Sequence, residues 1–365
     1  MIDISGLNEA QQEAVKTIDG ALLIIAGAGA GKTKTITYRI AHIIDEGMRA
    51  GSGINVEPKN ILAITFTNKA AAEMRHRAMD LLPANITSVP MIATFHSFCV
   101  KILREYAPLV GRSKTFTIMD EDDAKGLLKE IIEGFGLEAK QWEPRKIKSI
   151  ISREKNDNRN WQDLRGNVSS AFENQLVNIW ERYEKLCIER NTFDFDDLLI
   201  ETVRMFRENK SVLEKFQNLY TYIHVDEYQD TNKIQYSLID MLADKHKNLC
   251  VVGDSDQTIY TWRGARIENI LRFEEDYPNA RVIRLEQNYR STKNIIDAAN
   301  AVIENNKLRQ DKTLRTSNEG GDSIKVATLT DEKREAEFCV MECIALMDKG
   351  VKPDDIAILY RANFQ

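Results

Sequence analysis

The sequence predicts an α/β fold in which a parallel β-sheet is covered by helices and interrupted by a helical insertion. Short apolar runs rich in β-branched residues recur along the chain, as expected for the buried strands of a parallel sheet. Segments with helical periodicity lie between these runs, and this alternation is typical of an α/β domain. One long stretch, residues 112–194, breaks the alternation because its pattern is almost wholly helical.

The predicted strands are six apolar runs bounded by turns or polar residues: 22–25, 61–65, 222–225, 249–252, 282–285 and 356–359. The predicted helices outside the insertion are 33–46, 69–82, 98–106, 234–243, 292–305 and 331–349. A polar stretch at 306–322 leads into further strand signals. The expected organisation is a first α/β domain formed by 1–110 and 195–284, a helical insertion at 111–194, and the start of a second α/β domain at 285–365.

The overall composition is that of an ordinary globular protein. The 365 residues include 50 Lys and Arg against 56 Asp and Glu, and the net charge of −6 argues against a uniformly basic nucleic-acid binder. The longest apolar run, residues 21–30, is shorter than the roughly 20 residues of a membrane span, and no signal-like segment opens the chain. We therefore expect a cytoplasmic protein with no membrane partner. Five cysteines without a C-x-x-C pair indicate neither a disulfide framework nor a zinc site.

Local charge differs from the overall charge in two windows. Residues 59–112 contain seven Lys and Arg against three Asp and Glu, and residues 140–165 contain eight against four. Such windows suit contact with a polyanion, although a solvated helix face explains the second window equally simply.

Residues 26–33 read AGAGAGKT, directly after the predicted strand 22–25 and directly before a predicted helix. Glycines allow backbone N–H groups to turn inward around phosphate oxygens, and the helix N-terminus adds a positive dipole end. In such a loop Lys32 reaches the β- and γ-phosphates, and the Thr33 hydroxyl ligates Mg²⁺. Ala26 departs from the general pattern, which has Gly at this place. The alternative is a glycine-rich turn with no ligand.

A second element of the same site is expected at the end of the strand 222–225, where Asp226 and Glu227 follow directly. Two adjacent carboxylates at this place suit Mg²⁺ binding by Asp226 and polarisation of a water molecule by Glu227. Alone, an Asp-Glu pair after a strand is often structural. The upstream phosphate loop favours the functional interpretation.

Seven stretches, taken together, carry a family resemblance: AGAGAGKT (26–33), TFTNKAAAEM (65–74), TFHSFCVKILR (94–104), FDFDDLL (193–199), VDEYQDTN (225–232), VVGDSDQTIYTWRGA (251–265) and LEQNYRST (285–292). In this order and spacing they resemble superfamily 1A DNA helicases of the UvrD/Rep/PcrA type. The match extends from Leu7 to Arg361. It implies a P-loop NTPase with a RecA-like parallel sheet, a helical insertion and the start of a second RecA-like domain. The family also tolerates Ala at position 26.

The resemblance implies roles at an ATP–Mg²⁺ site. Gln11 matches an adenine-reading glutamine, Tyr289 stacks on adenine, and Arg290 matches an arginine finger. Gln257 matches a residue that senses the γ-phosphate and relays its state to DNA. The implied catalytic residues are Lys32, Asp226, Glu227, Gln257 and Arg290, and Thr33 and Asp226 are the implied metal ligands. The implied nucleotide-binding residues are Gln11, Ala26, Gly27, Ala28, Gly29, Ala30, Gly31, Lys32, Thr33, Tyr289 and Arg290.

The resemblance also implies contacts to single-stranded DNA at Thr65, Phe66, Asn68, Lys69, Thr94, His96, Tyr260, Trp262, Arg263 and Arg361. The aromatic members stack on unpaired bases in the family. Core packing is the alternative for Tyr260 and Trp262. His96 is not favoured as a catalytic base, because no nucleophile or metal set surrounds it in the sequence. Asp194, Asp196 and Asp197 form an acidic cluster to which we assign no catalysis.

These expectations combine into an ATP-driven 3′→5′ translocase and helicase that acts on single-stranded DNA and the duplex junction, in the cytoplasm near the nucleoid. In the family, the second motor domain continues further and supplies another γ-phosphate arginine. We therefore expect this chain, as an N-terminal portion, to bind ATP weakly and hydrolyse it poorly. The alternatives are a non-catalytic module that binds single strands or a protein, and a subunit of a helicase–nuclease.

Overall fold

A six-stranded, wholly parallel sheet forms the centre of this computed structural model, which describes residues 2–49, 53, 56–83, 86, 88–138, 140–261 and 264–360. The chain divides into two compact units, Met1–Glu319 and Gly320–Gln365, and the sheet belongs to the first. The strand order is β3-β2-β6-β7-β1-β8. The strands are β1 (Leu22–Ala26), β2 (Ile61–Thr65), β3 (Met91–Thr94), β6 (Tyr222–Val225), β7 (Leu249–Gly253) and β8 (Arg281–Leu285). The predicted α/β fold is thus confirmed.

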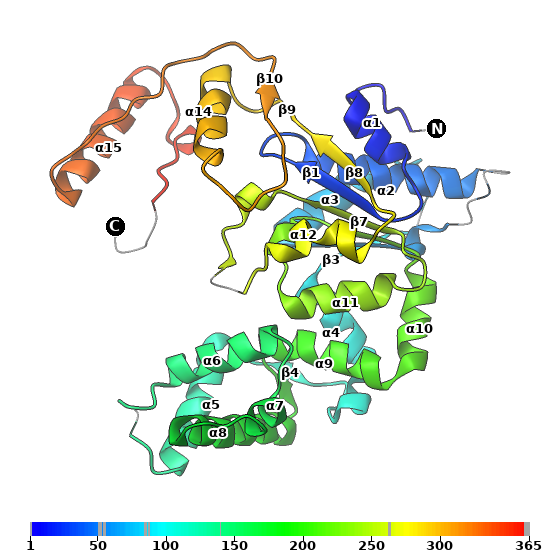
Figure 1. Cartoon of the computed structure of the whole chain (residues 1–365), viewed down its shortest axis with the longest axis vertical. Helices are drawn as coiled ribbons and strands as arrows, with labels where there is room; N and C mark the ends of the chain where they lie inside the picture. The colour runs from blue at the N-terminus through cyan, green and yellow to red at the C-terminus, as the bar shows by residue number, and fades with distance from the viewer. Residues whose placement is uncertain are drawn as a thin grey trace. The chain divides into compact units, whose positions relative to one another are not determined.

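Helices cover both faces of this sheet (Figure 1). Leu22 and Ile24 of β1 pack on one face with α1 (Glu9–Lys16), α2 (Lys32–Met48) and α3 (Asn68–Asp80). Leu23 and Ile25 pack on the other face with α4 (Phe95–Tyr106), α9 (Phe195–Glu208), α10 (Lys210–Leu219) and α11 (Lys233–Ala243). Successive side chains of a strand point to opposite faces, which explains why these strands are apolar throughout.

The predicted helical insertion forms a lobe with its own hydrophobic core (Figure 1). Its helices are α5 (Glu121–Gly134), α6 (Pro144–Asn156), α7 (Trp161–Arg165) and α8 (Ala171–Glu189). Asp120 begins α5 as an N-cap, with a capping box to Asp123. Two short strands, β4 (Thr117–Ile118) and β5 (Thr192–Phe193), pair where the chain enters and leaves the lobe.

The segments after β7 complete the first unit. They are the 3-10 turn η4 (Ser255–Gln257), α12 (Glu268–Leu271), α13 (Phe273–Asp276), β9 (Gln287–Asn288), α14 (Lys293–Ile303) and β10 (Arg315–Thr316), which pairs with β9. The second unit contains α15 (Glu332–Asp348) and the turn η6 (Pro353–Asp355). Among the described helices, none has both the length and the apolar character required to span a bilayer.

Five of the six predicted strands are present, one is absent, and β3 and the two-residue strands β4, β5, β9 and β10 were not predicted. The strand predicted at 356–359 does not form, and no strand is assigned among the described residues after 316. A strand requires ladder hydrogen bonds to a neighbour, and the described part of Gly320–Gln365 offers none. Met91–Thr94 of β3 runs directly into α4, so no turn marks its end in the sequence.

Candidate functional site

The glycine-rich loop 26–33 lies between β1 and α2, at the carboxyl edge of the sheet, where parallel α/β folds bind ligands. Gly29 and Gly31 have left-handed backbones, with φ of 70° and 83°. A Cβ on Gly29 would lie 2.6 Å from Asn288 Nδ2, and one on Gly31 would lie 2.7 Å from Gln11 Nε2. These two glycines therefore allow both a backbone turn and a close approach that an L side chain would prevent.

We expect Gly31→Ala to weaken ATP binding by about tenfold, because the methyl group would displace Gln11 and strain the loop by roughly 1–2 kcal/mol. A fluorescent ATP analogue titrated into the protein measures this loss. Gly111→Ala is the matched control, since Gly111 also has a left-handed φ of 74° but has nothing within 4 Å of an added Cβ. Equal affinity losses in the two variants would contradict the role of the Gln11 contact.

Asp226 and Glu227 follow β6 and face the loop. Lys32 Nζ lies 2.7 Å from Glu227 Oε2, so the two predicted elements meet although 195 residues separate them. Glu227 itself has a left-handed backbone, with φ of 50°, which is uncommon for a residue with a side chain. Burial, followed by the adjacent Glu227 carboxylate, raises the pKa of Asp226 to about 7.

The donors at this point fit Mg²⁺. The two adjacent carboxylates face the cation Lys32, and a bound metal cation would further favour the ionised form of Asp226. Among the described residues, no group of three or more His, Cys, Asp or Glu forms a metal cage. Mg²⁺ commonly binds through one or two protein oxygens together with substrate phosphates, so Thr33 and Asp226 suffice in type and number.

Gln11, Asn8 and Tyr289 come together beside the loop. Gln11 is buried, its Nε2 donates to the Ala30 carbonyl at 3.0 Å, and its Oε1 accepts from the Asn8 N–H at 3.2 Å. Asn8 Nδ2 donates to the Tyr289 hydroxyl at 2.8 Å. These bonds use one of the two N–H groups and one of the two oxygen lone pairs of the Gln11 amide. The second N–H group and the second lone pair can therefore bind the edge of a base.

The segment that carries Tyr289 and Arg290 is fixed to the loop through its backbone. Tyr289 N donates to the Gly29 carbonyl at 3.0 Å, and Asn288 Nδ2 donates to the Ala28 carbonyl at 2.7 Å. Asn288 Oδ1 accepts from the Arg290 N–H at 2.9 Å. Tyr289 and Arg290 are exposed, so their side chains border the loop from the solvent side.

Gln257 lies on the turn after β7, next to Asp254. Its Nε2 donates to Asp254 Oδ2 at 2.5 Å. Gln229, on the turn after β6, connects this region to the carboxylates, because its Oε1 accepts from the Asp254 N–H at 3.0 Å and its Nε2 donates to Glu227 Oε2 at 3.0 Å. Gln257 is thus joined to Glu227 by hydrogen bonds.

The DNA-contact candidates from two motifs meet at the ends of β2 and β3. Thr65 and Thr94 are register partners, and both are buried. Phe66 packs edge-on against Phe95, with ring centroids 5.7 Å apart. Ser97 Oγ donates to Asn68 Oδ1 at 3.4 Å, which bridges α3 and α4.

For the other candidates for DNA contact, the structure describes some side chains and leaves others out. Lys69 is exposed, Tyr260 is half-buried, and Trp262, Arg263 and Arg361 lie outside the described residues. The ring of His96 packs edge-on against Phe195, and burial lowers the pKa of this imidazole, which favours its neutral form. The packing of His96 is consistent with a structural or DNA-contacting role.

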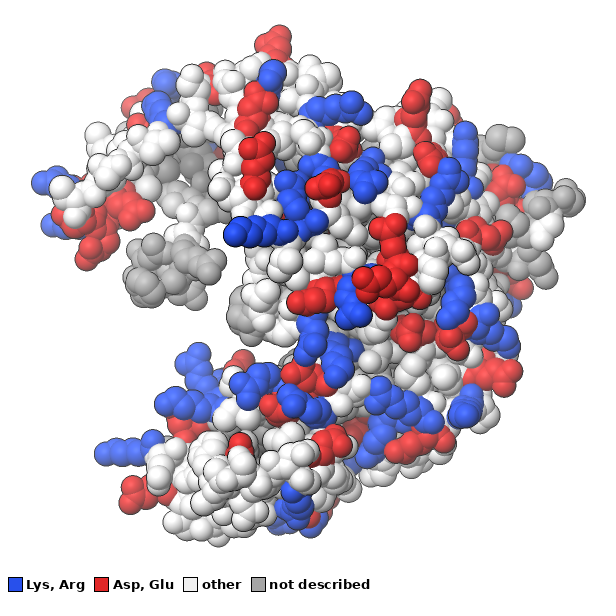
Figure 2. Space-filling model, in the orientation of Figure 1, with Lys and Arg blue, Asp and Glu red and all other residues white. Residues whose placement is uncertain are grey.

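In the second basic window, residues 140–165, two of the lysines are held in ion pairs and add little positive charge to the surface. Lys155 is buried with Asp194 and Asp197, at 3.2 and 2.5 Å, and Lys148 is paired with Asp196 at 2.7 Å. These two lysines therefore neutralise the acidic cluster instead of facing a polyanion. Lys and Arg side chains still gather over the helical lobe on the face shown in Figure 2, with acidic side chains among them.

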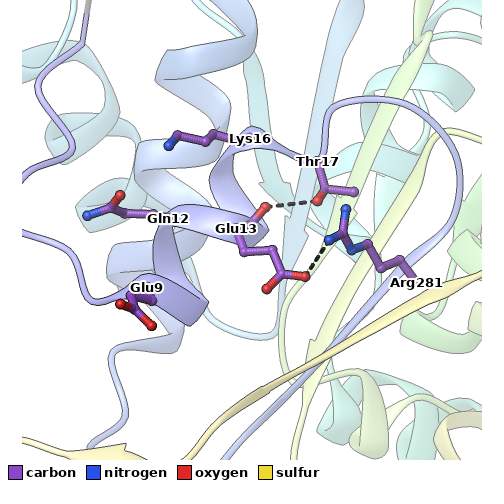
Figure 3. Close-up of a pocket in the computed structure, with 6 residues that line it drawn as sticks. All are labelled: Glu9, Gln12, Glu13, Lys16, Thr17 and Arg281. Carbon is purple, nitrogen blue, oxygen red and sulfur yellow. Dashed lines mark hydrogen bonds and ion pairs between the residues drawn. The ribbon is translucent and has the colours of Figure 1, made fainter.

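An open groove of about 460 Å³ lies on the outer side of α1 (Figure 3). Its lining residues are Glu9, Gln12, Glu13, Lys16, Thr17 and Arg281. Glu13 and Arg281 point toward one another and form a 2.6 Å ion pair, but both side chains are about half exposed, so the pair adds little stability. None of the predicted site residues lines this groove, and we assign it no ligand.

Sequence reasoning did not single out Asn8, Gln229, Asn288 or Lys312. Gln229 lies in the motif 225–232 and Asn288 in the motif 285–292. A search of these motifs for amide side chains, which both donate and accept hydrogen bonds, would have found them. Lys312 lies in a polar stretch without periodicity, and no sequence signal indicates its burial.

Comparison with known proteins identifies the family. The UvrD/REP helicase N-terminal domain matches residues 7–278, and the UvrD-like helicase C-terminal domain matches residues 283–365. The ATP-dependent DNA helicase PcrA of Staphylococcus epidermidis is 47% identical over 99% of this chain and 49% of the relative, and that of Staphylococcus aureus is 46% identical over 99% and 48%. The chain thus spans about half the length of these curated relatives. With a family model covering most of its length, this chain belongs to the UvrD/REP helicase family.

Proposed function

We propose that this chain is the ATP-hydrolysing part of a 3′→5′ DNA helicase that moves along single-stranded DNA. The observation that carries the proposal is the 2.7 Å pair between Lys32 of the phosphate loop and Glu227 after β6. It brings a phosphate-binding lysine and a carboxylate suited to activating water to one point at the carboxyl edge of the sheet. The relatives named above are ATP-dependent DNA helicases, which supports the same activity here.

In the proposed reaction, the loop N–H groups and Lys32 hold the β- and γ-phosphates. When bound by Thr33 and Asp226, Mg²⁺ would neutralise phosphate charge. Glu227 polarises the attacking water and accepts its proton, while Arg290 and Lys32 stabilise the charge that develops on the γ-phosphate oxygens. Gln11 and Tyr289 hold the adenine. Gln257 detects the γ-phosphate.

The proposed DNA path follows the carboxyl ends of β2 and β3. Thr65, Asn68, Lys69, Thr94 and His96 contact the strand there, and Phe66 stacks on a base. Tyr260, Trp262, Arg263 and Arg361 are further proposed DNA contacts, on the basis of the family resemblance alone. The proposed domain organisation places a first motor domain at 1–110 and 195–284, the insertion at 111–194 and the start of a second motor domain at 285–365. The separate core of the insertion supports this division.

Two further parts of the proposal concern location and substrate. The substrate includes the junction between single-stranded and duplex DNA, and the Lys and Arg side chains over the helical lobe support a contact with it. The place of action is the cytoplasm, at the nucleoid, since that is where such a substrate occurs.

A DNA-stimulated ATPase assay tests the proposal. With oligothymidylate present, we expect slow ATP turnover that Lys32→Ala lowers further, by about 10²-fold or more, because the γ-phosphate loses its positioned cation. Lys210→Ala is the control, since Lys210 is an exposed lysine at the start of α10, outside every proposed site. DNA binding without any ATP turnover would instead identify a non-catalytic single-strand-binding module.

A further inference from the structure

Lys312 is a buried lysine outside every motif described above. It lies in the segment between α14 and β10, and its side chain is only 4% exposed. Its Nζ lies 2.5 Å from Asp254 Oδ1 and also pairs with Asp256, and both carboxylates are similarly buried. Removing a lysine from water costs several kcal/mol, so this burial requires compensation by both carboxylates.

The remainder of the same segment packs against the turn that carries Gln257. Arg309 lies 3.3 Å from Asp256, and Asn306 Nδ2 donates to the same carboxylate at 3.1 Å. Gln310 N donates to Ser255 Oγ at 3.2 Å. Several polar contacts thus hold residues 306–312 on residues 254–257, and within this segment Lys312 has the most buried side chain of those that take part.

Asp254 connects Lys312 to the proposed catalytic residues. One oxygen of its carboxylate binds Lys312, and the other accepts the 2.5 Å hydrogen bond from Gln257 Nε2. The backbone N–H of Asp254 donates to Gln229, which in turn donates to Glu227. A continuous chain of contacts therefore runs from Lys312 to the Lys32–Glu227 pair.

We propose that Lys312 is a positioning residue that orients the Gln257 amide for detection of the γ-phosphate. This inference rests on the proposed function, because it assumes that ATP binds at this loop. A glutamine amide has two N–H donors, and Asp254 uses one of them, which leaves the second for a phosphate oxygen. An amide turned over would present its oxygen to the anion and repel it.

The Lys312 ammonium group holds one oxygen of the Asp254 carboxylate, so that the other oxygen faces Gln257. Without this cation, two buried carboxylates, Asp254 and Asp256, would lie close together with less positive charge between them, and the Asp254 side chain would rearrange. The acceptor that selects one orientation of the Gln257 amide would then be lost. Nucleotides with a γ-phosphate would be affected, whereas ADP would not.

Residues 288–312, which include this segment, contact the proposed nucleotide site at two places. Asn288, near its beginning, binds the phosphate loop, and Lys312, near its end, binds the sensor turn. A displacement of this stretch would therefore change both contacts, which links its position to the detection of the γ-phosphate.

The test uses the full 365-residue chain and compares Lys312→Met, Lys312→Arg and Lys307→Met. Met removes the charge and keeps the length of the side chain, Arg restores the charge, and Lys307 is an exposed lysine in the same segment. Three quantities are measured: kcat with oligothymidylate, the affinity for a non-hydrolysable ATP analogue, and the affinity for ADP. Thermal melting establishes that each variant is folded.

We expect Lys312→Met to lower kcat and the preference for the ATP analogue over ADP by about tenfold each, with an unchanged ADP affinity. Lys312→Arg should recover most of both, and Lys307→Met should match the unaltered chain. A folded Lys312→Met protein with unchanged kcat and preference would overturn this inference alone, as would an equal loss of ADP binding. Absence of nucleotide binding by the unaltered chain would overturn the proposed function and the inference together.

Discussion

Glu227→Gln is expected to lower DNA-stimulated ATP hydrolysis by about 10²–10⁴-fold while ATP binding is retained. The carboxylate lies 2.7 Å from Lys32 and 3.0 Å from Gln229, so it is held at the place where the attacking water has to be polarised. A glutamine has nearly the same shape but accepts no proton. Because Lys32 would no longer be paired with a carboxylate, ATP affinity should remain equal or increase. Single-turnover hydrolysis and equilibrium ATP binding separate the two effects.

Glu274→Gln is the matched control for this prediction, since Glu274 is an exposed glutamate of α13. It should hydrolyse ATP at the rate of the unaltered chain. If Glu227→Gln retained more than about a tenth of the turnover, Glu227 would not be the residue that activates water.

Lys155→Met is expected to destabilise the first unit by about 3–5 kcal/mol, because it leaves buried carboxylates without their cation. Lys155 Nζ lies within 3.2 Å of Asp194, Asp197 and Glu184, and its side chain is 2% exposed. Asp194 also begins α9 as an N-cap, so the loss would reach the connection between the helical lobe and the sheet domain. Urea unfolding followed by circular dichroism measures the change.

Lys146→Met serves as the control for Lys155→Met. Lys146 lies on the same helix, α6, but its side chain is 76% exposed and pairs with Glu143 at the surface. Its replacement should change the free energy of unfolding by no more than about 0.5 kcal/mol. Similar destabilisation by both variants would mean that the buried cluster contributes no more than surface pairing.

Much of the sheet and of the nucleotide site was predictable, because both depend on local sequence. Strands such as β1 and β6 are uninterrupted apolar runs, and the side chains of parallel strands are buried on both faces. The sequence predicted that the phosphate loop and the end of β6 belong to one site, but the 2.7 Å pair between Lys32 and Glu227 was not itself predicted. The positions of Gly29 and Gly31 followed from the turn that a phosphate loop requires.

The remaining features depend on contacts between segments far apart in the sequence. Charge counting included Lys148 and Lys155 in a basic window, whereas both lysines pair with Asp194, which is 39 or more residues away in the sequence. Lys312 is buried by a turn more than 50 residues upstream, and its own surroundings are polar. A strand such as 356–359 requires a partner that an apolar run does not supply.

The order of the sheet has a mechanical consequence. Strand β8 pairs with β1, with Leu285 opposite Ala26, and the chain that leaves β8 carries Asn288, Tyr289 and Arg290 within five residues. Adjacent strands lie about 5 Å apart, so the point about which this outgoing chain would turn is one strand spacing from the phosphate loop. By simple geometry, if the outgoing chain rotated by about 10° about this point, its atoms beside the loop would move by about 1 Å. Its atoms roughly 30 Å from the same point would move by about 5 Å. If the outgoing chain turned about the end of β8, a small displacement beside the phosphate loop would therefore correspond to a larger displacement farther along the chain.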